Sequence, residues 1–362
     1  MVQELIVAFI ILNMYGIIRK KNNWFVILLS SIVIYVIMGF NSFTTDYPFY
    51  ESYYKTQNFS MDFEMGFVVL SELIYWMGLD YQGFLLIYFA ICLSVFAFAI
   101  KGLDVNVHAI LLLYLMTQMF MDINEIRQTM AYFCFAYIIK NYTKYNNRLK
   151  YVFYIIAASF FHRSILLFLP TVFIVGRKGI SEKKLKVFFI IIAVCCIGVF
   201  VNGNRIPGLN LILIALGLGT KAVYFESSTQ YGFLLMWAAY FSNLFVVYLA
   251  KRKINKHPYL YDGSKGEYIS ILWKVLLYSA FAMPLCMLNS EFIRCYQFTV
   301  VPVIIVMAMM INKKVYIDKM NLMRIVPYNL CLYLYLVIYS FTYQHWRIVE
   351  EVIDNNLIND LF

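Results

Sequence analysis

The stretch HAILLLYLMTQMFMDINEIRQTMAYFCFAYIIK, residues 108–140, places two acids, an arginine and a glutamine between two apolar runs. The runs, His108–Phe120 and Gln128–Ile139, contain 13 and 12 residues. A helix that crosses a hydrocarbon core of ~30 Å needs about 20 residues. The stretch therefore predicts a hairpin of two short membrane helices, with its polar turn around Arg127 roughly 10 Å below the membrane surface. Polar groups at that depth are costly unless they face a cavity or one another, so the turn is a candidate functional site.

The composition of the whole chain is typical of a membrane protein. Of its 362 residues, 62% are hydrophobic and 14% are charged, and the mean hydropathy is +0.71. Soluble globular domains are about 45–50% apolar and about 25% charged. Apolar runs of roughly 17–21 residues recur along the chain, as membrane helices require. The sequence therefore predicts an all-α, polytopic integral membrane protein with one transmembrane domain, residues 1–362.

Twelve apolar segments are predicted to span the membrane. They are Val2–Ile18, Trp24–Phe40, Phe84–Ile100, His108–Phe120, Gln128–Ile139, Tyr151–Phe161, Ser164–Val175, Val187–Val201, Phe233–Ala250, Tyr268–Leu288, Cys295–Ile311 and Ile325–Phe341. Two large loops interrupt them, residues 41–83 and 202–232. In the first, Phe63–Gly78 carries two glutamates and is predicted to form an amphipathic surface helix. The second contains a short, glycine-rich apolar part, which predicts a re-entrant or surface helix.

The distribution of lysine and arginine predicts the orientation of these helices. With the N-terminus on the outer side, 22 of the 30 basic residues fall in inner loops and 15 of the 20 acidic residues fall outside. Cytoplasmic loops characteristically carry such an excess of lysine and arginine. Both termini, both large loops and the turn at Arg127 are thus predicted on the outer face. The net charge of +10 belongs to the inner loops, so no nucleic-acid partner is expected.

Two more outer turns are predicted to carry arginine. A second short hairpin, Tyr151–Phe161 with Ser164–Val175, has His162 and Arg163 in its turn, and a later turn contains Arg294. The guanidinium group suits bidentate recognition of phosphate. Cationic turns gathered at one face therefore predict a shared anion-binding cavity.

Acidic residues add an alternative and a candidate base. The alternative to an anion site is a structural ion pair, Arg127 with Asp122 or Glu125, that only locks helices together. Asp46 follows the second predicted span by a few residues, which places a carboxylate near the membrane surface, where it can act as a general base. No HExxH, GxxxxGK[ST] or GxSxG motif occurs, so no metal site and no cofactor are predicted.

Four segments follow one another in an order typical of a known family. They are TTDYPFYESYY, residues 44–54; FEMGF, residues 63–67; NEIRQTMAYFCFAYIIKNYTKYNNRLKYVFYIIAASFFHRSILLFLP, residues 124–170; and EFIRCYQF, residues 291–298. The first two are similar to a D-x-x-x-Y…E-x-G-[FY] pattern. The third has an Arg-Gln pair that opens a helix, then a basic loop, then a helix that ends in FHRS. The fourth is similar to a late arginine segment. Together they resemble the EpsG-type, Wzy-like bacterial polysaccharide polymerases, over roughly residues 38–300. Arg163 stands where lysine is common in that family.

The resemblance implies a GT-C-like membrane glycosyltransferase that makes O-antigen, capsule or exopolysaccharide. Its site would lie on the periplasmic or outer face of the bacterial cytoplasmic (inner) membrane. It would transfer a growing glycan from undecaprenyl diphosphate to a sugar hydroxyl of another lipid-linked repeat unit. Expected partners are the undecaprenyl-diphosphate-linked oligosaccharide and the lipid bilayer, and a chain-length regulator is left open as a third.

Depth, charge and motif position give each candidate residue a role. We expect the catalytic residues to be Asp46 as the base, and Arg127 and Arg294 as the groups that hold the departing diphosphate. The residues expected to bind substrate are Gln128, His162, Arg163, Glu64, Tyr47 and Tyr50. Glu64 is also the reserve base.

Other functions stay open on the sequence. A flippase or transporter of lipid-linked oligosaccharide would also have a charged cavity, but such folds often show internal repeats, and no convincing repeat is present. A membrane O-acyltransferase of the polysaccharide would need a catalytic histidine, for which His162 is the candidate. A ligase that moves finished polymer is chemically close to a polymerase. A passive structural protein would not need recessed arginines.

Overall fold

The computed structural model describes residues 1–19, 21–57, 63–175, 181–209, 215, 225, 229–256, 263–311 and 343–360. All regular elements within these residues are helices, as predicted. They are α1 Val2–Arg19, α2 Trp24–Gly39, α3 Tyr47–Thr56, α4 Met65–Trp76, α5 Tyr81–Ile100, α6 Val107–Thr117, α7 Met119–Asn124, α8 Ile126–Tyr145, α9 Arg148–Ser159, the 3-10 helix η1 Arg163–Phe173, α10 Glu182–Val201, α13 Phe233–Lys256, α14 Gly263–Ser279, α15 Ala282–Leu288, the 3-10 helix η4 Ser290–Ile293, α16 Arg294–Ile311, α18 Tyr343–Asp354 and the 3-10 helix η5 Leu357–Asp360.

Five helical segments of the described chain are long and apolar enough to cross a membrane. They are Val2–Arg19, Tyr81–Ile100, Glu182–Val201, Phe233–Lys256 and Ser290–Met310. The pair α14 and α15, bent by 42° at its break, makes a sixth if it counts as one span. The protein is therefore a multi-pass membrane protein. The predicted span Ile325–Phe341 and most of the loop 202–232 lie outside the described residues.

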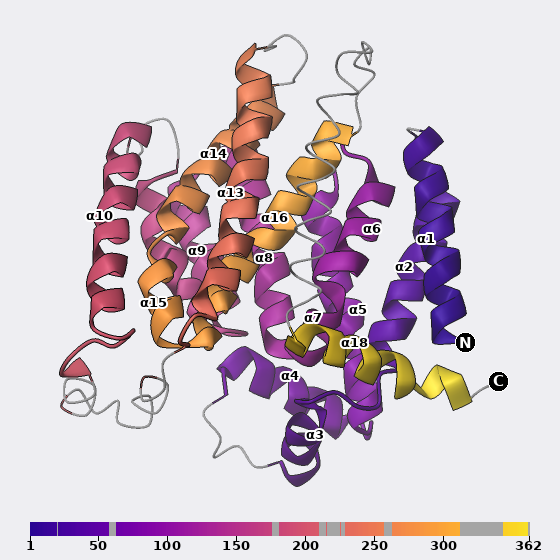
Figure 1. Ribbon diagram of the computed structural model, residues 1–362. Helices are drawn as coiled ribbons and strands as arrows, with labels where there is room; N and C mark the ends of the chain where they lie inside the picture. Colours follow the sequence, from indigo (N-terminus) through magenta and orange to yellow (C-terminus); the bar gives the residue numbers. More distant parts are fainter. Residues whose placement is uncertain are drawn as a thin grey trace.

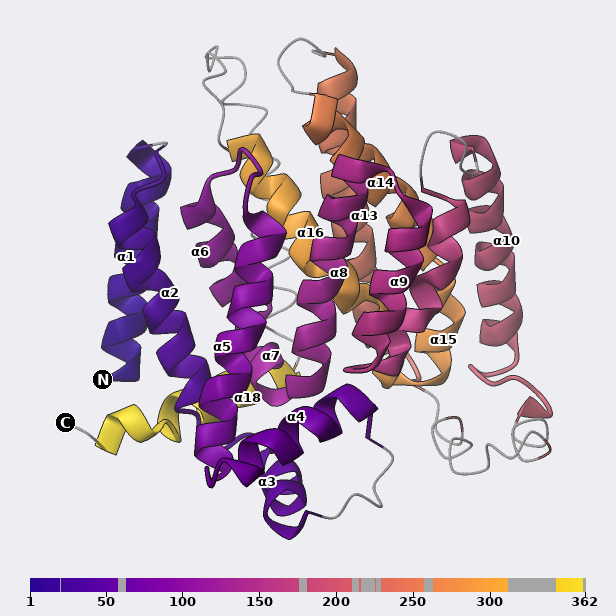
Figure 2. The ribbon, with the colours of Figure 1, turned by 180° about the vertical axis from the view of Figure 1, so that it is seen from behind.

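Two central helices organise the bundle. α8 contacts α5, α9, α14 and α16, and α16 also contacts α6, α13 and α14. Figure 1 shows α1 and α2 on one side of this centre and α10 on the other, and Figure 2 shows the same order from behind. In the segment that contains α16, 83% of the residues are buried, because neighbouring helices enclose it. In α10 only 17% of the residues are buried.

The hairpin predicted over residues 108–139 differs from its prediction in both legs. The first leg is broken at Gln118 into α6 and α7, and it continues to Asn124. The second leg does not end at Ile139: α8 continues to Tyr145 and has 20 residues. Its last turns are polar in sequence, but Asn141 and Thr143 are buried, and Thr143 bonds back to the carbonyl of Ile139 (2.9 Å). Packing therefore extends the helix beyond the apolar run. The second hairpin is short as predicted, with 12 residues in α9 and 11 in η1.

A layer of short helices covers the end of the bundle where α7 meets α8, hereafter the α7–α8 end. Figure 1 shows α3, α4 and α18 across this end. The predicted surface helix in Phe63–Gly78 is present as α4. This layer thus covers the Arg127 turn (Figure 1), and the depth of the turn in a membrane stays a prediction.

The C-terminal segment, to which the sequence analysis assigned no role, is anchored to this end. The Leu357 amide donates to the carbonyl of Phe40 (3.0 Å), and Asn356 Nδ2 donates to the carbonyl of Ile37 (3.0 Å). Thr45 Oγ1 donates to Glu351 Oε2 (3.0 Å). α18 and η5 therefore fix the chain just before Asp46.

The opposite ends of α1, α2 and α6 are joined by a buried polar cluster. His108 Nδ1 lies 3.1 Å from Asn13 Oδ1, and Asn13 Nδ2 donates to Ser30 Oγ (2.9 Å). A Cβ added at Gly16 would lie 2.3 Å from the His108 ring. The imidazole thus occupies the space that a side chain at Gly16 would need.

Gly16→Ala is expected to destabilise the protein by about 1–3 kcal/mol, because the buried ring cannot move without breaking its hydrogen bonds. The measurement is the melting temperature of the purified protein in detergent. The matched control is Gly198→Ala in α10, where an added Cβ meets nothing within 4 Å. Equal melting temperatures for the two variants would contradict the packing argument.

Candidate active site

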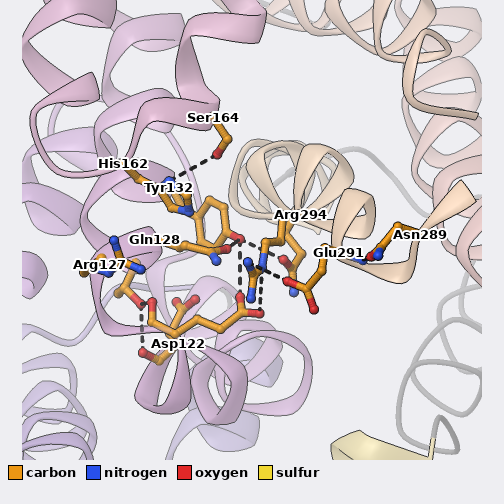
Figure 3. Close-up of polar contacts among 12 residues, drawn as sticks. Asp122, Arg127, Gln128, Tyr132, His162, Ser164, Asn289, Glu291 and Arg294 are labelled. Atoms are coloured by element: carbon orange, nitrogen blue, oxygen red, sulfur yellow. Dashed lines mark hydrogen bonds and ion pairs between the residues drawn. The ribbon is translucent and has the colours of Figure 1, made fainter. Parts of the chain in front are cut away.

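Four segments distant in sequence converge at the α7–α8 end. They are the loop before α4, the α7–α8 turn, the turn between α9 and η1, and the start of α16 with the preceding η4. Figure 3 shows Gln128 between His162 and Arg294, with Arg127 to one side and Glu291 to the other. The three arginine-bearing turns that the sequence predicted therefore do meet.

Arg127 is held by one carboxylate and two aromatic rings. Its Nη1 lies 2.5 Å from Glu64 Oε2, and its Nε donates to the hydroxyl of Tyr50 (3.1 Å). The guanidinium carbon lies 4.5 Å from the centre of the Phe63 ring, a cation–π contact. The Arg127 side chain keeps 22% of its surface exposed. It is thus firmly oriented and still reachable.

Glu64 joins the first loop to both arginine turns. Its Oε1 accepts the backbone amide of Arg163 (3.2 Å) and lies 3.5 Å from His162 Nδ1. Burial raises the pKa of Glu64, but the hydrogen bond with His162 and the charge of Arg127 outweigh burial and lower the pKa to about 2. So acidic a carboxyl is a weak base. Glu64 is therefore better suited to anchoring than to the reserve base role.

The close packing around Gly66 explains why the FEMGF segment has a glycine. Its amide donates to the carbonyl of Phe160 (2.7 Å), and an added Cβ would lie 2.8 Å from the same oxygen. This close approach of two backbones brings Glu64 within reach of the amide of Arg163. The glycine and the glutamate of the motif thus serve one junction.

Gly66→Ala is expected to lower turnover at least tenfold, because the junction must open by several tenths of an ångström and Glu64 moves with it. For the polymerase activity that the sequence resemblance implies, the measurement is polymer synthesis by purified membranes, normalised to protein level. Gly83→Ala, where the nearest atoms are side-chain atoms 3.0–3.4 Å away, is the control. Full activity of the Gly66 variant would contradict the assigned role.

Arg294, the first residue of α16, has two carboxylate neighbours. Its Nη1 lies 2.6 Å from Glu291 Oε2, and its Nε lies 3.5 Å from Glu125 Oε1. The side chains of Glu125 and Arg294 are 8% and 32% exposed, whereas that of Glu291 is 43% exposed. Glu125 is therefore a buried partner of Arg294, and Glu291 is a partner at the surface.

Gln128 links the turns through its amide. In the orientation that satisfies both ends, its nitrogen donates to Glu125 Oε2 (3.1 Å) and its oxygen accepts from Arg294 Nε (2.7 Å) and His162 Nε2 (3.2 Å). The hydroxyl of Tyr132 contacts Gln128 and donates to Gln297 Oε1 (2.7 Å).

Burial lowers the pKa of His162, although Glu64 favours its charged form. His162 is thus suited to positioning by hydrogen bonds.

Asp46 lies at the start of α3, beside the arginines. Its amide donates to Asn124 Oδ1 (3.0 Å), which ties the first loop to the α7–α8 turn. Burial raises the pKa of its carboxyl; Arg294 and Arg127 lower that pKa, and Glu291 raises it. The net pKa is raised, so Asp46 is a stronger base than an ordinary aspartate.

The contacts of two further candidates differ from those above. Arg163 contributes its backbone amide, and its side chain is exposed. Tyr47 packs edge-on against Tyr81 of α5, with ring centres 4.9 Å apart. Substrate binding by these two side chains stays a prediction.

The alternative pairing of Arg127 with Asp122 or Glu125 is wrong. Asp122 accepts hydrogen bonds from Tyr114 (2.7 Å) and Gln118 (3.0 Å), and Glu125 faces Arg294. Arg127 pairs instead with Glu64, which reaches it from the separate α3–α4 loop. Proximity in sequence therefore indicated the wrong partner.

Several residues of the cluster were missed by sequence reasoning. They are Phe63, Tyr132, Glu291 and Gln297. Glu291 precedes Arg294 by three residues, a spacing that signals an ion pair on a helical turn. Gln297 offers no such signal, because its contact with Tyr132 joins two helices far apart in the chain.

The family model described as the EpsG family matches residues 24–350, a range that includes all four converging segments. The chain belongs to the EpsG family. This EpsG-family protein is accordingly a polysaccharide-polymerase-like membrane protein, of a family associated with glycosyltransferase-like polymerase activity. No curated protein and no solved structure matches the chain.

Proposed function

We propose that this EpsG-family protein is a polysaccharide polymerase of the cytoplasmic membrane. It transfers a growing glycan from undecaprenyl diphosphate to a hydroxyl of another lipid-linked repeat unit. The proposal includes twelve spans in a GT-C-like arrangement, both termini on the outer face, and a site that opens to that face. The observation that carries it is the convergence of Arg127 and Arg294, each partly exposed, around Gln128 and next to Asp46.

The proposed reaction assigns each group a step. Asp46 accepts the proton of the acceptor hydroxyl, whose oxygen forms a bond to the anomeric carbon of the growing chain. The bond between that carbon and the diphosphate oxygen breaks, and the diphosphate leaves with the electron pair. Arg127 and Arg294 stabilise the negative charge that develops on it, as preorganised cations do. Gln128 and His162 keep these reacting groups in position.

The carboxylates beside the arginines have distinct roles in this proposal. Glu64 and Glu125 are buried and orient Arg127 and Arg294. Glu291 is exposed and occupies Nη1 of Arg294 in the free protein. The diphosphate displaces it, because a guanidinium binds phosphate oxygens with the same geometry as a carboxylate.

Glu291→Gln is therefore expected to lower the lipid-diphosphate concentration at half-maximal rate by up to about fivefold, the range of an exposed ion pair. The measurement is initial rate against concentration of lipid-linked repeat unit in detergent. Glu350→Gln, an exposed glutamate on α18, is the control. Weaker binding in the Glu291 variant would show that this carboxylate assists the substrate.

The function itself is tested by deleting the gene and separating the surface polysaccharide by size. A polymerase is expected to leave single repeat units, restored to full length by the wild-type gene. Loss of all surface product would favour the flippase, and long unattached polymer the ligase. Normal chain length without acetyl groups would favour the O-acyltransferase. Any of these three outcomes would overturn the proposal.

A further inference from the structure

A cavity of about 920 Å³ lies far from the arginine cluster, at the opposite end of the bundle. Its walls come from α2, α5 and α6, between Trp24 and Tyr35, Ala90 and Gly102, and Val107 and Leu111. These are the ends of α2 and α5 remote from Gly39 and Gln82, which contact each other at the α7–α8 end. The cavity is thus separate from the proposed catalytic site.

The walls of this cavity are mostly apolar, and its two serine hydroxyls are already hydrogen-bonded. Most lining residues are aliphatic or aromatic. The hydroxyl of Ser31 donates to the carbonyl of Ile27 (2.8 Å), and that of Ser94 donates to the carbonyl of Ala90 (2.7 Å). Both hydroxyls are therefore satisfied within their own helices. The two serines therefore place no unsatisfied hydroxyl in the way of a hydrocarbon chain.

One end of the cavity carries positive charge. Lys101 lines it at the end of α5 and is exposed. Lys140 of α8 donates to the carbonyl of Phe98 (2.6 Å), and Phe98 also lines the cavity. Lys101 is thus part of the mouth, and Lys140 reaches a lining residue from a neighbouring helix.

This mouth is held in shape by a neighbouring asparagine. Asn22 Nδ2 donates to the carbonyl of Val105 (2.9 Å), and Asn22 Oδ1 accepts the amide of Val107 (2.9 Å). These bonds fix the loop between α5 and α6 against the start of α2. The mouth is therefore shaped by tertiary contacts of the chain itself.

We propose that this cavity binds one acyl chain of an anionic phospholipid, with the lipid phosphate at Lys101 and Lys140. The combination selects for that class of ligand. A zwitterionic lipid gains less from the lysines, because its own cation already balances the phosphate, and free phosphate gains nothing from the apolar walls. Under the predicted topology the mouth lies at the inner membrane surface, where lysine near anionic lipid is favourable.

The test uses the full-length protein purified in detergent, with phosphatidylglycerol and phosphatidylcholine of identical chains as probes. Bound lipid is counted by native mass spectrometry, and stabilisation by the shift in melting temperature. Phosphatidylglycerol is expected to bind and stabilise, and phosphatidylcholine to bind and stabilise much less. Equal effects of the two lipids would overturn the proposal.

Two variants separate the headgroup contact from the chain contact. Lys101→Gln with Lys140→Gln is expected to weaken phosphatidylglycerol binding by about 30-fold, since each lysine near a membrane surface contributes about fivefold. Ala97→Phe narrows the cavity and is expected to abolish binding with both lysines intact. Lys184→Gln, exposed on α10, is the control and should bind normally.

Two further outcomes would overturn the proposal that the cavity binds an anionic phospholipid. Unchanged binding in Ala97→Phe would place the lipid elsewhere and overturn the proposal. Displacement of phosphatidylglycerol by an equal amount of undecaprenyl phosphate would make the cavity a substrate site and overturn it as well. Neither result depends on whether the protein polymerises polysaccharide, because binding is measured directly.

Discussion

Arg294→Ala is expected to lower the rate of polymerisation by about 10²–10³-fold, the usual cost of removing one preorganised donor from a developing negative charge. Arg294 meets Glu125, Glu291 and, through Gln128, the turn that carries Arg127. Its loss removes half of the proposed diphosphate clamp. The measurement is the length distribution and rate of polymer formed from lipid-linked repeat units by membranes with matched protein levels.

Two further variants distinguish a catalytic loss from a folding defect. Arg294→Lys keeps the charge but loses the planar fork and the Nε bond to Gln128, so its rate should remain at least tenfold below wild type. Arg148→Ala, exposed at the start of α9, should retain full rate. If Arg294→Ala is well folded and elongates normally, the diphosphate site lies elsewhere.

Asp46→Asn is expected to lower turnover by about 10²–10⁴-fold, the range for loss of a general base. Asparagine preserves the shape of the side chain and the backbone bond to Asn124, so the fold should persist. Asp46→Glu should recover part of the rate. Unchanged turnover in the asparagine variant would move the base to another residue.

The pH profile tests the same assignment independently. Burial raises the pKa of Asp46 above its ordinary value, and only the ionised carboxylate can accept a proton. The wild-type rate should therefore fall as pH decreases through this raised pKa, above the value of about 3.9 for a free aspartate. The residual rate of Asp46→Asn should lack this acid limb. A limb that persists in the variant would belong to a different group.

The helical membrane class follows from composition and run length. A bilayer excludes unpaired backbone groups, which leaves helices and closed barrels, and long continuous apolar runs favour the helix over the alternating strands of a barrel. The start of most helices also follows from local pattern. The end of α8 does not, since Asn141 and Thr143 are kept helical by neighbours that the local sequence cannot specify.

The candidate site divides in the same way. Charge in three turns predicted to lie on the same face was enough to predict that Arg127, His162 and Arg294 belong together. The partners of these residues were not predictable from spacing: Glu64 reaches Arg127 from the α3–α4 loop, and Glu125 turns to Arg294. The C-terminal helix that fixes Thr45 beside the site gave no signal at all.

The sequence by itself determined that this is a membrane protein, which residue types gather at one end of it, and which family it resembles. Hydropathy and charge are properties of each segment alone. Tertiary structure decided which carboxylate neutralises which arginine, which are left partly exposed, and how the short helices cover them. Those outcomes depend on distances between segments up to about 300 residues apart, and such distances exist only once the helices have packed.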